Sequence, residues 1–391
     1  MKRIGVTSLK PGMVFSKPVY SEGDSLLVPE QVPIRQREID FLHDCGIIYV
    51  LTAGALVNNK ENSPDKKPSK DEKQQTPEKK TIKRFSISDV EDNTGPYRAY
   101  KNLIEKLSAI FTSLKNDVSV EMRTIDNISM ILLQDLREYP DKFIKYILGG
   151  EVSGQELAKS SVNTAILSAL TAQELKLTNH KIHNVVSGAL LHDIGMLRLS
   201  KRITEKKGGL SDAELEQIKS HPIHTSRIVT KELLGSQEVN LIALQHHERW
   251  DGNGYPDKLA GPAIDMGARI VSVADAFEAM VSKKSYRDSL SGYQAVKNLL
   301  ADNARRFDPA VIMAFTKVMG IYPIGSIVRL NENSIARVVS INTIAPVRPV
   351  IQMLTDKNGD TLPLGQQTTI NLLTMKTLFI KSAIENDDDL E

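Results

Sequence analysis

His192-Asp193-Ile194-Gly195 closes an apolar run from Lys181 to Leu191 whose spacing predicts a helix. Metal sites that catalyse hydrolysis use neutral imidazoles and carboxylates as ligands, and an adjacent His-Asp pair supplies one of each. Asp193 can lie between two metal ions while His192 binds one of them. This stretch therefore predicts a helical domain organised around a metal centre.

Further candidate ligands follow at His221, at the pair His246-His247 and at Asp275. Asp275 interrupts an apolar helical pattern, where a buried charge is costly unless a metal or another partner offsets it. His246 and His247 are expected to point in different directions from one helix end, so they could serve different metals. The other four histidines are interpreted as structural or surface residues: His43, His180, His183 and His224.

The composition is that of an ordinary globular protein, with 41% hydrophobic and 25% charged residues in 391. A formal net charge of +2 gives no indication of a DNA-binding surface. Cys45 is the one cysteine, so no intramolecular disulfide can form, which favours a cytoplasmic location. The N-terminus lacks the apolar run of a signal peptide, and no membrane span is expected.

Two segments precede the helical region. Residues 1–57 are expected to form a β-rich domain, with strands over Arg3 to Thr7, Met13 to Val19 and Ile47 to Leu51, and a helix over Arg35 to Gly46. Residues 58–95 are dominated by charged and polar side chains and by proline. Such a segment cannot bury enough apolar surface to offset its ordering entropy, so it is interpreted as a flexible charged linker.

Helical periodicity continues from residue 96 to about 320 and is divided into a connector, residues 96–150, and a metal-binding domain, residues 151–320. Ser211 and Glu214 form a sequence pattern typical of a capping box. The apolar helices predicted over residues 97–148 could support a dimer interface, so a homodimer is one possible oligomeric state. Residues 321–391 are expected to form a small β appendage, with strands over 327–330, 335–342 and 350–354, and an acidic tail.

The motifs together resemble the HD-GYP family of HD-superfamily phosphodiesterases. The resemblance rests on His192-Asp193-Ile194-Gly195 and on the run from His246 to Pro256, which contains Gly254-Tyr255-Pro256. It covers residues 150 to 320. The first 57 residues also resemble a β-rich domain that often precedes HD-GYP domains. The expected fold is mostly α, an all-helical HD-type metal-binding domain with small β-rich units at both ends.

The resemblance implies hydrolysis of a cyclic dinucleotide, chiefly cyclic di-GMP with 3',3'-cyclic GMP-AMP as the other candidate, in bacterial signalling. It implies two divalent metal ions, iron or manganese, or three if Glu156 binds one. His192 and Asp193 are the expected catalytic pair, and Tyr255, Lys284 and Arg287 are expected to bind substrate. The implied metal ligands are Glu156, His192, Asp193, His221, His246, His247 and Asp275.

The sequence shows three departures from the family pattern. Ser160 stands where the family usually has a metal-binding histidine, Met196 replaces a lysine, and Lys284-Ser285 replaces Arg-Pro. Lys284 keeps the charge but not the forked geometry of arginine. Ser160 and Met196 are expected near one metal.

The departures leave three hypotheses open: an active cyclic-dinucleotide phosphodiesterase, a catalytically impaired receptor that signals through its other domains and protein partners, and an interaction scaffold without metal. Activity is preferred, because the other ligands and the Gly-Tyr-Pro loop are present together.

Overall fold

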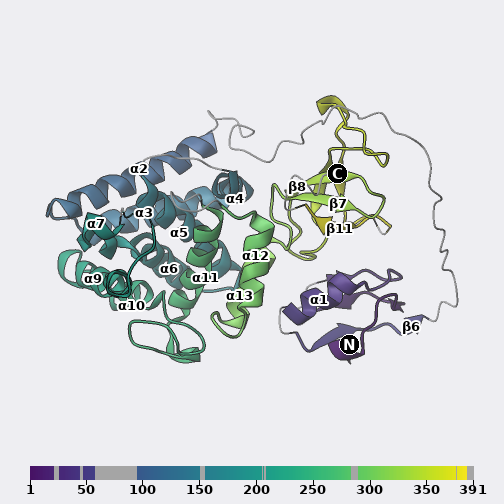
Figure 1. Ribbon diagram of the computed structural model, residues 1–391, viewed down its shortest axis with the longest axis horizontal. Coiled ribbons are helices and arrows are strands. Elements are labelled where there is room, and N and C mark those ends of the chain that lie inside the picture. The colour runs from purple at the N-terminus through teal and green to yellow at the C-terminus, as the bar shows by residue number, and fades with distance from the viewer. Residues whose placement is uncertain are drawn as a thin grey trace.

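The computed structural model describes residues 1–21, 26–44, 47–57, 95–149, 155–204, 206, 208–282, 289–375 and 377–384. The described elements fall into a β-rich N-terminal unit, a helical domain and a C-terminal β unit (Figure 1). Cys45 and, apart from Gly95, the predicted linker lie outside the described residues. The five-segment division drawn from the sequence remains a prediction.

In its described part, the N-terminal unit contains an antiparallel sheet in the order β1-β5-β3-β4, a separate pair of strands and one helix. The continuous strand predicted from Met13 to Val19 is wrong, because the chain forms two short strands that belong to different sheets. Pro18 has no N–H to donate to a ladder, which explains a break beside it. The elements are β1 (Lys2–Gly5), β2 (Val14–Phe15), β3 (Val19–Tyr20), β4 (Leu26–Val28), α1 (Gln36–Asp44), β5 (Tyr49–Thr52) and β6 (Leu56–Val57).

The helical domain is built around α5, which is buried over almost its whole length and packs against α2, α6, α11 and α13. Small and apolar residues occupy every face of α5, as expected for a central helix. The domain comprises α2 (Gly95–Lys115), α3 (Met122–Glu138), α4 (Pro140–Gly149), α5 (Glu156–Glu174), α6 (Asn179–Leu191), α7 (Lys201–Thr204), α8 (Asp212–Lys219), α9 (His221–Arg227), α10 (Gln237–Gln245), α11 (Met266–Val281), α12 (Gly292–Ala301) and α13 (Pro309–Met319).

Capping interactions fix where several of these helices begin. The capping box predicted for Ser211 and Glu214 is confirmed at the start of α8. Asp265 caps α11 by accepting hydrogen bonds from the backbone N–H groups of Gly267 and Ala268. None of the described helices has the length and apolar character needed to cross a bilayer.

The C-terminal unit is an antiparallel sheet whose described strands lie in the order β10-β9-β8-β7-β11. Val328, Val338 and Ile351 contribute to its buried core. Its last two strands had not been predicted from the sequence. The strands are β7 (Ile327–Leu330), β8 (Ile335–Ser340), β9 (Val350–Met353), β10 (Thr369–Asn371) and β11 (Ile380–Ala383).

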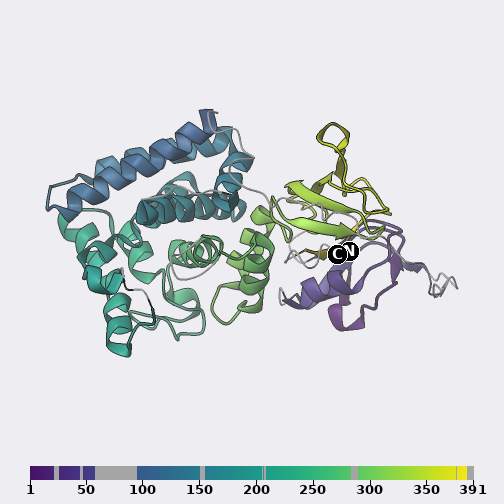
Figure 2. The same ribbon diagram turned by 45° about the horizontal axis from the view of Figure 1, so that its top comes forward.

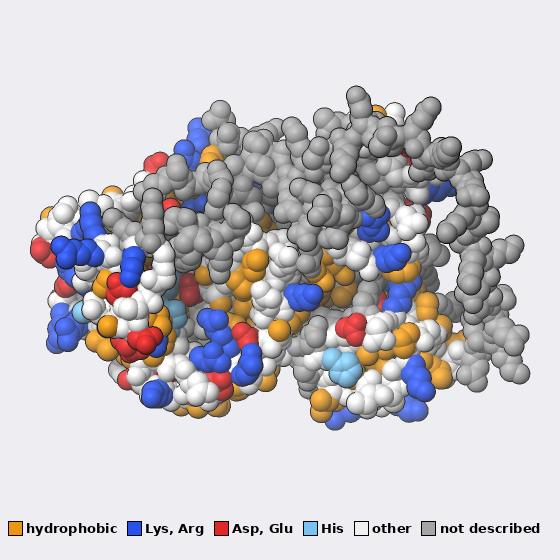
Figure 3. Space-filling view, in the orientation of Figure 1, with side chains coloured by type: hydrophobic (Ala, Val, Ile, Leu, Met, Phe, Trp, Pro, Cys, Tyr) orange, Lys and Arg blue, Asp and Glu red, His pale blue; other side chains and the backbone are white. Residues whose placement is uncertain are grey.

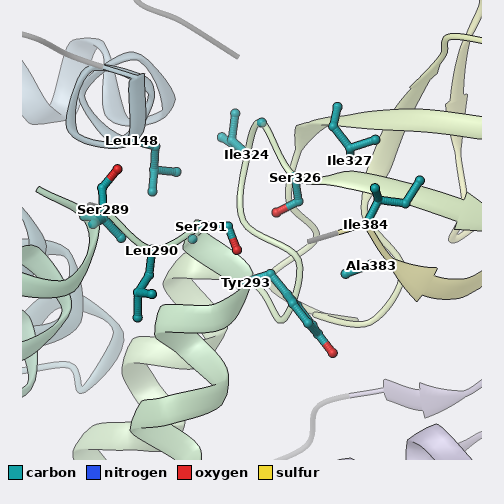
Figure 4. A pocket seen from close by; sticks show the side chains of 13 residues that line it. Leu148, Ser289, Leu290, Ser291, Tyr293, Ile324, Ser326, Ile327, Ala383 and Ile384 are labelled. Carbon is teal, nitrogen blue, oxygen red and sulfur yellow. The ribbon is translucent and has the colours of Figure 1, made fainter. Parts of the chain in front are cut away.

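The two β units lie side by side although they come from opposite ends of the chain (Figures 1 and 2). The Leu26 N–H donates to the Ile344 carbonyl at 2.7 Å, and the Arg35 guanidinium carbon lies 3.2 Å from the centroid of the Phe379 ring. A cavity of about 170 Å³ lies where the C-terminal unit meets the helical domain, with Tyr293 and Ser326 in its wall (Figure 4).

Candidate metal centre

Helix ends bring the predicted ligands together. His192 and Asp193 follow directly after α6, His246 and His247 follow α10, and His221 opens α9. Asp275 projects from the middle of α11. Two groups of potential ligand atoms result, each with all its atoms within 4.8 Å of one another: Asp193, His221, His246 and His247; and His192, Asp193 and Asp275.

In the first group, two imidazoles face one carboxylate oxygen. His221 Nε2 lies 3.0 Å and His246 Nε2 lies 3.7 Å from Asp193 Oδ1, and the two nitrogens are 3.4 Å apart. His246 and His247 both belong to this group. The idea that they serve different metals is therefore not supported, because their rings lie together, with centroids 4.0 Å apart.

In the second group, His192 lies between two carboxylates. His192 Nε2 is 3.5 Å from Asp193 Oδ2 and 3.5 Å from Asp275 Oδ1. Asp193 thus directs one oxygen toward each group, which is the arrangement of a carboxylate that bridges two cations. The sequence had predicted a bridging role for Asp193, and the geometry is consistent with that role.

Backbone carbonyls define which ring nitrogen is free in three of the histidines. The Nδ1 atoms of His192, His221 and His246 each lie 2.7 Å from the carbonyl oxygen three residues earlier. A carbonyl can only accept, so Nδ1 carries a hydrogen, and in the neutral ring Nε2 keeps the lone pair that can bind a metal. His192 Nε2 is buried and has no hydrogen-bond partner among the described residues. A metal cation would satisfy this atom, so the donor set fits a divalent metal.

The electrostatics of the site also favour cations. Burial lowers the pKa of His247 well below its usual value and lowers the pKa of His246, so both imidazoles are neutral and able to bind metal. Burial opposes ionisation of Asp275, but the His192 ring outweighs it and brings the pKa of Asp275 to about 2. Burial likewise opposes a charge on His192, yet Asp193 and Asp275 raise its pKa well above the usual value. The two carboxylates therefore favour positive charge where His192 Nε2 lies.

The loop after α10 closes one side of the centre. The Tyr255 ring stacks on His247 with centroids 4.8 Å apart, and Gly254 has no room for a side chain, since a Cβ there would lie 2.4 Å from the Arg249 nitrogen. Glu248, which the sequence reasoning missed, is buried and accepts hydrogen bonds from the N–H groups of Asp257 and Leu259. The carboxylate thus stabilises the loop from within, and no local sequence pattern indicated this.

Thr225 is a second residue that the sequence reasoning missed. Its hydroxyl donates to the His192 carbonyl at 3.0 Å and accepts from the Gly195 N–H at 2.9 Å. Gly195 is required there, because a Cβ would lie 2.1 Å from the His221 carbonyl oxygen. Thr225 and Gly195 therefore fix the turn that carries the His-Asp pair against α9.

The remaining residues singled out from the sequence either belong to neither ligand group or lie outside the described residues. Glu156 begins α5 with an exposed side chain and belongs to neither ligand group. The Ser160 hydroxyl donates to Glu278 Oε2 at 2.7 Å, inside the core. Met196 is half-buried in the turn after Asp193. Lys284 and Arg287 lie outside the described residues, and none of His43, His180, His183 and His224 belongs to either group.

The fold and the paired ligand groups define an HD domain protein with a metal-binding centre. Residues 152–311 match the model of the HD domain family, and residues 327–390 match that of a KOW domain associated with the HD domain. Together with the Gly254-Tyr255-Pro256 loop, these findings show that the chain belongs to the HD-GYP family.

Three curated relatives illustrate the similarity. The cyclic di-GMP phosphodiesterase PdeB of Borreliella burgdorferi is 30% identical over 75% of this chain and 76% of its own length. The cyclic di-GMP phosphodiesterase response regulator RpfG of Xanthomonas campestris is 38% identical over 39% of this chain and 40% of its own. The 3'3'-cGAMP-specific phosphodiesterase 2 of Vibrio cholerae is 28% identical over 48% of this chain and 36% of its own.

Proposed function

We propose that this protein is a metal-dependent phosphodiesterase that hydrolyses a cyclic dinucleotide in bacterial signalling, with cyclic di-GMP as the first candidate substrate. The observation that carries the proposal is Asp193, whose two carboxylate oxygens face two separate groups of ligands. The names of PdeB and RpfG favour cyclic di-GMP, and the Vibrio cholerae relative makes 3',3'-cyclic GMP-AMP the second candidate.

The candidate ligands divide into two sets that share Asp193. One metal would be held by Asp193, His221, His246 and His247, and the other by His192, Asp193 and Asp275. The mixed imidazole and carboxylate donors suit iron or manganese. Two such cations would supply Lewis-acid activation of water and of the phosphate. Tyr255, stacked on His247, limits the side from which a substrate approaches, while Asp193 and Asp275 are partly exposed.

Two further expectations concern partners and location. The apolar residues of 97–148 that suggested a dimer pack inside the helical domain, where Leu103, Leu107 and Leu132 are fully buried. Val118 and Met130 of the same segment are exposed, so the homodimer stays a prediction. A cytoplasmic location and signalling protein partners are predictions as well.

The deciding experiment measures metal content and turnover together. Protein loaded with Mn(II) or Fe(II) should contain about two metal equivalents and should linearise cyclic di-GMP or 3',3'-cyclic GMP-AMP. Asp193→Ala should lose both properties, whereas Asp141→Asn, at an exposed carboxylate on α4, should keep them. Metal-loaded wild type without turnover of either nucleotide would contradict the proposal, and nucleotide binding in that case would indicate the receptor hypothesis.

A further inference from the structure

A cleft adjoins the metal centre and is lined by His247 and by the loop that carries Tyr255. Its volume is about 780 Å³, within the range of roughly 300–1,000 Å³ that is usual for small-molecule sites. His247 and Tyr255 form its inner wall, and Lys219, Lys258 and Arg306 come from three different segments to line the rest. The cleft therefore joins one metal ligand to basic side chains, and Glu216 and Glu248 also line it.

The charged residues of the cleft differ in whether they already have partners. Arg249 is held by Asp251, with Nη2 to Oδ2 at 2.8 Å, and Lys219 pairs with Glu216 at 2.7 Å. Among the described residues, Arg306 and Lys258 make no ion pair. Two positive charges are thus available to a ligand.

Arg306 is the better placed of the two. It is half-buried, and its guanidinium lies 4.8 Å from the centroid of the Phe307 ring, which restricts its movement. Lys258 is exposed and long, so more of its attraction is lost to solvent and to side-chain entropy. Figure 3 shows basic side chains, in blue, on this face of the helical domain, with acidic side chains, in red, among them.

Tyr255 lies between the metal centre and this basic region. Its ring stacks on His247, with centroids 4.8 Å apart, and it lines the same cleft as Arg306. A ligand in contact with Tyr255 can touch the metal ligands at one end and Arg306 at the other.

We propose that this cleft is an anion subsite that holds the second phosphodiester of a cyclic dinucleotide, with Arg306 as its main binding residue and Lys258 as a weaker one. The proposal rests on the proposed function. A cyclic dinucleotide carries two phosphodiesters, and only one can occupy the metal centre during a cleavage event. The other keeps its negative charge, and a guanidinium without an ion pair can bind it through two parallel hydrogen bonds.

The test compares a substrate with two phosphodiesters and one with a single phosphodiester. Manganese-loaded full-length protein is assayed with cyclic di-GMP and with bis(p-nitrophenyl) phosphate. Arg306→Gln should raise KM for cyclic di-GMP about tenfold while kcat changes less than about twofold, since a charged hydrogen bond contributes about 1.4 kcal/mol or more. The ratio of kcat/KM for the dinucleotide to that for the single diester should fall by the same factor. Arg306→Lys should recover part of the loss.

Arg305→Gln is the matched control, because Arg305 is the adjacent arginine, pairs with Asp302 and does not line the cleft. An unchanged KM in Arg306→Gln, or an equal loss on both substrates, would overturn the subsite.

Calorimetric titration with cyclic di-GMP distinguishes failure of the subsite from failure of the proposed function. If the wild type binds the nucleotide without cleaving it and Arg306→Gln loses affinity, the subsite is supported and only the enzymatic proposal is contradicted. If the wild type does not bind the nucleotide, both proposals are contradicted.

Discussion

Asp275 and Glu278 lie one turn apart on α11, yet their carboxylates have opposite surroundings. Asp275 faces the His192 ring across 3.5 Å in a part of the site that remains partly open. Glu278 is buried and accepts hydrogen bonds from Ser160 at 2.7 Å, Asn163 at 3.2 Å and Ser282 at 2.5 Å. A buried carboxylate with three donors is satisfied without a cation, whereas Asp275 has only the His192 ring facing it at 3.5 Å among the described contacts, which leaves its carboxylate able to bind a cation.

This contrast changes the interpretation of Ser160, which stands where the family usually has a metal-binding histidine. The sequence suggested that a missing histidine leaves one metal short of a ligand. In the structure the Ser160 hydroxyl belongs to the Glu278 network, which Tyr100 extends by donating to Asn163 at 2.7 Å. The substitution therefore has a structural partner, and the two ligand groups assemble without it.

The largest expected effect is on catalysis. Asp275→Ala removes a ligand from the group that holds His192, so turnover of cyclic di-GMP should fall by about 10³-fold or more, as several kcal/mol of metal-derived transition-state stabilisation are lost. Metal content should drop toward one equivalent while the far-ultraviolet circular dichroism spectrum stays that of wild type. Full metal content with full activity would show that Asp275 is not a ligand.

The next largest effect is on stability. Glu278→Ala leaves buried donors from Ser160, Asn163 and Ser282 without an acceptor and creates a cavity, so unfolding free energy should fall by about 3 kcal/mol. Urea denaturation measures this change, and Glu238→Ala, at an exposed position on α10, should stay within about 0.5 kcal/mol of wild type. Loss of metal with unchanged stability would place Glu278 in the metal centre and remove the contrast with Asp275.

The smallest effect tests the serine itself. Ser160→His inserts a ring into a packed site beside Glu278, and overpacking should cost about 1–3 kcal/mol without adding a metal equivalent. Combining it with Glu278→Asp shortens the facing carboxylate, so the double variant should recover about 1 kcal/mol relative to the sum of the single changes. A rise in both metal content and rate in Ser160→His alone would instead show that the wild-type centre is short of a ligand.

Local patterns along the chain predicted much of the architecture. The helix predicted from Lys181 to Leu191 is observed as α6 (Asn179–Leu191), and Ser211 was predicted as a helix cap. Prediction failed where elements were short, as at β10 and β11, or where proline broke an apparent strand, as beside Pro18. Strands of three or four residues carry little periodicity, whereas several helical turns repeat the same spacing.

The sequence by itself determined the types of ligand, because His192-Asp193, His246-His247 and Asp275 stand in patterns that indicate imidazole and carboxylate donors. Only the tertiary structure decided that Asp193 faces two groups, that Ser160 donates to Glu278, and that Arg306 shares a cleft with Tyr255. The physical reason is that residue type and local periodicity can be read from short stretches of the sequence. Which side chains contact each other between distant segments depends on how α5, α11 and the loop after α10 pack, and packing is a property of the whole domain.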